Sequence, residues 1–225
     1  MSTAPTGEST RDDDGGDGPA LEMRELPATA RGVRTRLALV EAARRVFERD
    51  GYLDSRLVDI AAEAGCSTGT FYTYFDNKEQ AFAAVLEEAR EEMLHPGIDK
   101  VGLEADPVVV VEASTRAYLE AYRRNAQLMG LFEQVANIDP RFRELRRRRA
   151  RAFAERNARA IADLQERGLA DATLDPLMAS RALSGMVSRL AYQCYVLGDE
   201  MAFDDLVRTS VKLWANALRL PGSSP

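Results

Sequence analysis

Apolar residues recur at helical spacing along this chain from residue 31 onward, and no segment keeps the strict apolar–polar alternation of a strand. Three Asp-Pro pairs, at 106–107, 139–140 and 175–176, place an N-cap acid before a proline at the first helical position. The pattern predicts an all-α fold of about nine helices. They are expected at about 33–50, 57–64, 68–75, 77–94, 107–124, 126–136, 140–166, 176–197 and 204–218.

The strongest local pattern lies within residues 52–78. Apolar residues at i, i+3, i+4 and i+7 give residues 57–64 one apolar helical face, and Gly65 can adopt the left-handed conformation that ends such a helix. Ser67 then occupies an N-cap position, and a second short helix begins at Thr68. Two short helices joined by a tight glycine turn are typical of a helix-turn-helix, whose second helix enters the major groove of DNA.

The two faces of that second helix differ in chemistry. Phe71 and Phe75 are four residues apart and predict a core anchor, whereas Thr and Tyr hydroxyls occupy the other faces. Gly69 has no side chain, so another surface can approach the start of the helix closely. Lys78 adds a positive charge nearby. A helix N-terminus with exposed hydroxyls suits contacts with phosphates and base edges.

Residues 34–82 resemble the N-terminal domain of TetR-family transcriptional regulators. The matching pieces are Ala42-Ala43, Phe47, Gly51-Tyr52, Asp59-Ile60-Ala61, Ala64-Gly65-Cys66-Ser67, Gly69-Thr70-Phe71-Tyr72, Phe75 and Asn77-Lys78-Glu79. The resemblance implies an N-terminal three-helix helix-turn-helix DNA-binding domain at 31–80 and a C-terminal helical effector-binding and dimerisation domain at 81–225. Residues 1–30 are expected to form a disordered acidic tail.

The same resemblance implies positions that contact DNA. Ser55 is expected to cap the helix at 57–64 and to contact phosphate, and Arg56 beside it to add a phosphate contact or to be merely exposed. The base-facing positions are Thr68, Gly69, Thr70 and Thr73, and the phosphate-contacting positions are Tyr72, Tyr74 and Lys78. Cys66 and Tyr74 depart from the family's usual aliphatic residue and histidine.

Two amphipathic helices close the chain and are expected to pair with their copies in a four-helix bundle. The expected dimer contacts are Leu183, Val187, Leu190, Cys194, Val211 and Trp214. Packing of both helices inside one subunit is the alternative. A two-fold dimer predicts an inverted-repeat, palindromic operator in double-stranded DNA.

The middle helices are expected to enclose an effector pocket, as the resemblance implies, lined by Tyr118, Tyr122, Phe132, Phe153 and Met186. Such a lining favours a small hydrophobic or amphiphilic effector, for example a fatty acid or an acyl-CoA. Nine arginines between Arg141 and Arg159 have two interpretations. They form either a solvated, salt-bridged helix or, for a few of them, a site for an anionic effector group.

Charge and composition narrow the function further. The net charge is −6, but residues 1–30 hold seven acids and two arginines, so the remaining chain is nearly neutral. Two distant cysteines and one histidine offer no disulfide framework, no metal site and no cofactor site. No phosphate loop, nucleophile elbow, membrane span or signal peptide is visible. We therefore expect a cytoplasmic DNA-binding repressor rather than an enzyme, with an interaction protein as the alternative.

Overall fold

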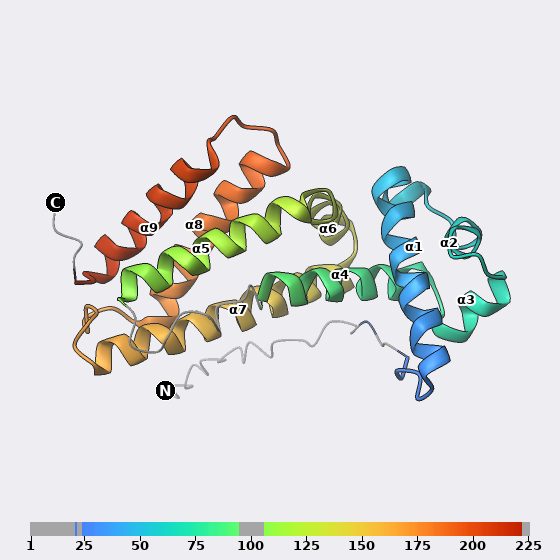
Figure 1. The fold of residues 1–225 in the computed structure, drawn as a ribbon, viewed down its shortest axis with the longest axis horizontal. Helices are drawn as coiled ribbons and strands as arrows, with labels where there is room; N and C mark the ends of the chain where they lie inside the picture. The colour runs from blue at the N-terminus through green and yellow to red at the C-terminus, as the bar shows by residue number, and fades with distance from the viewer. Residues whose placement is uncertain (1–20, 22–23, 95–105, 222–225) are drawn as a thin grey trace, which may run out of the picture.

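The computed structural model describes residues 21, 24–94 and 106–221. These residues form nine α-helices and no strand (Figure 1). The helices are α1 (Ala30–Asp54), α2 (Leu57–Glu63), α3 (Thr68–Tyr74), α4 (Lys78–Leu94), α5 (Pro107–Arg124), α6 (Ala126–Ile138), α7 (Pro140–Glu166), α8 (Pro176–Tyr195) and α9 (Phe203–Leu218).

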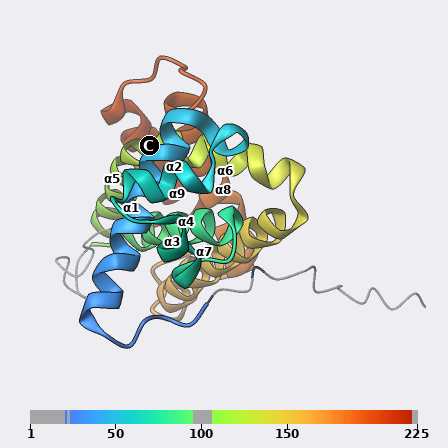
Figure 2. The ribbon, with the colours of Figure 1, turned by 90° about the vertical axis from the view of Figure 1, so that its right-hand side faces the viewer.

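The first three helices form one end of an elongated molecule (Figure 1). Helix α4 leads from this end into a bundle of the remaining five helices, in which α9 packs on α5 and α8 packs on α7. Seen along the long axis, α2 and α3 lie in front of the bundle with their outer surfaces unobstructed (Figure 2). The predicted helix-turn-helix is therefore placed at the tip of the molecule.

The ends of the helices follow from capping chemistry. The carboxylates of Asp106, Asp139 and Asp175 accept hydrogen bonds from backbone N–H groups in the first turns of α5, α7 and α8, at 2.7–2.8 Å. Within α1, Gly51 has a φ of 78° and kinks the helix. Residues with a side chain rarely adopt this backbone conformation. The observed helix bounds agree with the predicted ones to within a few residues.

One continuous core joins the DNA-reading end to the bundle. The ring of Phe82 on α4 lies 5.0 Å from that of Phe47 and 4.9 Å from that of Tyr52, both on α1. The ring of Phe142 on α7 lies 5.3 Å from that of Phe82 and 6.0 Å from that of Tyr52. Helix α4 therefore contacts both α1 and α7 through this aromatic cluster.

Part of the segment expected to be a disordered tail makes defined contacts. The Thr29 hydroxyl accepts a hydrogen bond from the Gly32 N–H at 3.1 Å and starts α1. Leu21 packs against the main core cluster. Residues 1–20, which carry five of the seven acids of this segment, lie outside the described residues, as does His95.

Candidate DNA-binding site

The turn between α2 and α3 has the geometry that its sequence predicts. Gly65 has a φ of 68°, and the hydroxyl of Ser67 accepts a hydrogen bond from the Thr70 N–H at 3.1 Å, which caps α3. Phe71 and Phe75 are buried in the core beneath α3. Helix α3 is thus anchored to the core on one face, and its opposite face is exposed.

That opposite face presents the expected DNA-contacting residues. Thr68, Gly69, Tyr72 and Thr73 are exposed, and Thr70 and Tyr74 are half-buried. The Thr73 hydroxyl donates to the Gly69 carbonyl at 3.2 Å within the helix. A row of hydroxyls on the outer face of a short helix at the tip of the molecule suits insertion into a groove of DNA.

The structure corrects the role expected for Ser55. Its side chain is buried, and its hydroxyl donates to the Tyr52 carbonyl at 2.9 Å, so it does not cap α2. The N-cap position belongs to Arg56, which makes no side-chain capping bond. The kink at Gly51 turns the following residues back against α1, and sequence spacing alone does not reveal this turn.

Arg56 is exposed at the start of α2 and pairs with Asp59, one turn along, at 2.8 Å. The hydrogen bond from Arg56 lowers the pKa of Asp59. The guanidinium is still accessible, so the phosphate contact expected of Arg56 stays a prediction.

Lys78 has a defined set of partners in the protein itself. Its ammonium donates to the carbonyls of Tyr52, Leu53 and Ser55 at 2.8, 3.1 and 3.2 Å. It also lies 4.7 Å from the centre of the Tyr52 ring. An ammonium has three N–H donors, and these contacts use all of them. Lys78 therefore closes the end of α1, and its expected phosphate contact stays a prediction.

Arg24 is a contact that the sequence analysis missed. Its guanidinium donates to the Thr73 carbonyl at 2.9 Å and pairs with Asp76 at 2.6 Å. The hydrogen bond from Arg24 lowers the pKa of Asp76, and a second one from Gln80 adds to the effect. The only signal in the sequence is one of two arginines in an acidic segment, which does not identify a partner.

Residues 39–85 match the family described as bacterial regulatory proteins, tetR family. This match confirms the TetR-family resemblance for that N-terminal segment. It is 39% identical over 57 residues to the transcriptional regulator TtgR of Pseudomonas putida, and 36% identical over 52 residues to the fatty acid metabolism regulator protein of Bacillus subtilis. These matches cover 25% and 23% of this chain and 27% of each relative. The matched part of the chain therefore spans about a quarter of the length of these relatives.

Solved structures extend the likeness to the whole TetR-family fold. SmeT, described as the repressor of a multidrug efflux pump of Stenotrophomonas maltophilia, has a TM-score of 0.69 at 21% identity, over 84% of this chain and 93% of that chain. The fatty acid degradation regulator FadR of Bacillus halodurans has a TM-score of 0.68 at 18% identity, over 83% and 97%. Identities this low establish the fold alone.

Three of the five expected effector-pocket residues, Tyr118, Tyr122 and Phe153, form one aromatic cluster. Tyr122 and Phe132 are buried, and the other three, Tyr118, Phe153 and Met186, are half-buried. The Tyr118 ring lies 5.6 Å from that of Phe153 and 5.9 Å from that of Tyr122. Burial raises the pKa of Tyr118 to about 12, so its hydroxyl stays protonated. A surface groove of about 560 Å³ between α5 and α9 involves none of these five residues.

The six residues expected at the dimer interface face the protomer's own core. Val187 and Val211 are buried within one chain, and Leu183, Leu190, Cys194 and Trp214 pack against the core clusters. The outward face of α8 carries Met178, Ala182, Gly185 and Arg189 instead. The apolar stripe thus packs largely inward within one chain, and the dimer contacts expected of these six residues stay a prediction.

The described residues contain neither a membrane-spanning helix nor a metal-binding cluster. None of their helices is long and apolar enough to cross a membrane. No group of three or more His, Cys, Asp or Glu side chains is placed to hold a metal ion in this part of the chain.

Proposed function

We propose that this protein is a sequence-specific DNA-binding transcriptional repressor of the cytoplasm. In this proposal a homodimer binds an inverted-repeat operator, and a small hydrophobic or amphiphilic effector releases it. The domains act at 31–80 for DNA binding and 81–225 for effector binding and dimerisation. The observation that carries the proposal is α3, which is anchored by buried Phe71 and Phe75 and exposes hydroxyls at the tip of the molecule.

Dimerisation is assigned to the outward side of α8 and α9. On α8, Met178, Ala182, Gly185 and Arg189 fall at i, i+4, i+7 and i+11 and share one exposed face. A Cβ at Gly185 would meet no atom within 4 Å, so this face has room for a second helix. Small residues let two helices approach closely, and a two-fold pairing there would present two copies of α3 to one face of the duplex.

A hydrophobic or amphiphilic effector is supported by the aromatic side chains inside the bundle. Two relatives by sequence or fold are described as regulators of fatty acid metabolism or degradation, which is consistent with such an effector. Effector binding would favour a second conformation, in which the two recognition helices have a different spacing. The affinity for DNA can then fall by no more than the ratio of the effector's affinities for the two conformations.

Selection of duplexes from a random pool, followed by mobility-shift titration, tests the proposal. We expect an inverted repeat to be enriched. Thr68→Ala should change the preferred base at one position of each half-site, with about fivefold loss for the selected operator, since one base contact is worth about 1 kcal/mol. Thr209→Ala on α9, also exposed, serves as the matched control and should bind as the unchanged protein does. Failure to enrich any sequence would refute the proposal.

A further inference from the structure

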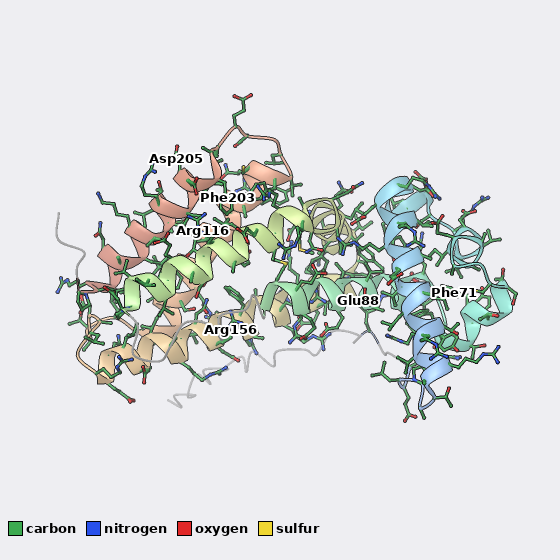
Figure 3. The ribbon with its side chains drawn as sticks, viewed as in Figure 1. Phe71, Glu88, Arg116, Arg156, Phe203 and Asp205 are labelled. Carbon is green, nitrogen blue, oxygen red and sulfur yellow. The ribbon has the colours of Figure 1, made fainter. Side chains whose placement is uncertain are left out.

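The arginines of α7 fall into two groups with different surroundings. Four of them, Arg147, Arg148, Arg151 and Arg159, are exposed to solvent. Arg149, Phe153 and Arg156 fall at i, i+4 and i+7 on one face, and Figure 3 labels Arg156 on this helix. Burial lowers the pKa of both Arg149 and Arg156, to about 10 for Arg149. Arg149 and Arg156 are therefore less solvated than the four exposed arginines, although Arg149 is salt-bridged as the first interpretation expects.

Arg149 is the more deeply placed of the two, with 15% of its side chain exposed. Its guanidinium lies over the ring of Phe132 on α6, at 5.4 Å from the ring centre. One terminal nitrogen pairs with Glu87 on α4 at 3.2 Å. The Nε atom is buried and has no hydrogen-bond partner. A buried, charged N–H without an acceptor is unfavourable, and a carboxylate that accepts from Nε and a terminal nitrogen together is its best complement.

The partner of Arg149 is on the helix that leads to the DNA reader. A second ion pair, between Arg141 and Glu79 at 3.4 Å, also joins α7 to α4. The two glutamates are eight residues apart on α4, and the two arginines are eight residues apart on α7. The two ion pairs therefore link α4 to α7 along about two turns of each helix. Phe82, which packs against the rings of α1, lies between them in the sequence of α4. The position of α4 relative to α7 thus depends on these arginine–glutamate contacts.

We propose that Arg149 is the receptor for the carboxylate of an amphiphilic effector, and that this carboxylate competes with Glu87 for the guanidinium. The acyl chain of such a ligand would pack among the aromatic side chains beside it, where the ring of Phe132 lies under Arg149 and that of Phe153 under Arg156. Loss of the Arg149–Glu87 pair would remove one ionic link between α4 and α7. The inference rests on the proposed function, because it names the ligand class and the coupling residue of the same regulator.

Calorimetric binding of dodecanoate and of dodecanol tests this proposal without DNA. The two probes share a chain length and differ in the charge of the head group. We expect the unchanged protein to prefer dodecanoate by about tenfold or more, as expected for a hydrogen-bonded ion pair. Arg149→Met should bind both probes alike, because methionine keeps the volume and removes the charge. Arg148→Met, an exposed neighbour with the same charge change, should keep the preference.

Variants of the partner test the competition. Glu87→Gln should bind dodecanoate more tightly than the unchanged protein and should bind the selected operator more weakly even without ligand. Glu87 also pairs with Arg90, so Arg90→Gln is the matched control and should leave both affinities unchanged. Circular dichroism checks that each variant is folded. If Arg149→Met does not fold, Arg149→Lys provides the test, since it keeps the charge but loses the paired N–H geometry, and should retain only part of the preference.

Three results would overturn the inference. One is no binding of dodecanoate to the unchanged protein, and another is an equal preference for dodecanoate in Arg149→Met. The third is equal binding of both probes by the unchanged protein, which an ordered water on the Nε–H would produce. In each case operator binding by the unchanged protein remains a separate measurement. Its presence would preserve the proposed function, and its absence would refute that function independently.

Discussion

Replacing Lys78 with methionine distinguishes two roles for this side chain. In the first role Lys78 contacts a DNA phosphate, as the family resemblance implies. In the second it holds the end of α1 together by donating to the carbonyls of Tyr52, Leu53 and Ser55. Methionine keeps most of the aliphatic stem over the Tyr52 ring and removes only the charged donor, so the substitution isolates the ammonium.

The structure sets the size of the expected effect. Hydrogen bonds from a charged group contribute about 1.5–3 kcal/mol, and a cation over an aromatic ring about 0.5–1 kcal/mol. The three acceptors share one ammonium, and water can reach the half-exposed site after substitution. We therefore expect a loss of about 2 kcal/mol in the free energy of unfolding, which for a chain of this length lowers Tm by roughly 4–8 °C.

Two measurements check this expectation. Urea unfolding gives the change in stability, with Lys212→Met on α9 as the control, because Lys212 is exposed and should change it by less than about 0.5 kcal/mol. Operator affinity measured across a range of salt concentrations gives the number of phosphate contacts. One lost contact lowers the slope of log K against log salt by about 0.9. A reduced slope with unchanged stability would refute the structural role.

Three further predictions concern other parts of the molecule. Glu88, labelled on α4 in Figure 3, has its pKa raised by burial and by the charge of Glu41, so its ionised form is disfavoured in the folded state. Glu88→Gln should therefore raise Tm at pH 7, and this gain should disappear below about pH 4, where the carboxyl is protonated whether folded or not. An equal gain at pH 3.5 would exclude this cause. Ala182→Arg should turn a dimer into a folded monomer, as measured by size-exclusion chromatography with light scattering. Val187→Arg should instead unfold the chain, because Val187 is buried. A dimer that survives Ala182→Arg would place the interface elsewhere. Phe71→Ala should cost about 3–5 kcal/mol in urea unfolding, since its ring is fully buried, and a loss below about 1 kcal/mol would show that it does not anchor α3.

Local chemistry in the sequence determined the helices and the helix-turn-helix. Asp-Pro starts, glycine stops and apolar periodicity act within a few residues, so they predict where a helix begins and ends without knowledge of its neighbours. The two anchors Phe71 and Phe75 and the cap at Ser67 were predicted for the same reason.

Tertiary structure decided which neighbour each face and each long side chain meets. The apolar face of α8 that contains Val187 has the same periodicity whether a partner chain or the protomer's own core covers it. In the structure α8 packs on α7, and Val187 is buried within its own chain. Lys78 and Arg149 reach partners 26 and 62 residues away in the sequence, at Tyr52 and Glu87. Because a flexible cationic side chain fits a solvated face and a buried contact equally well, only the fold determines which of the two it occupies.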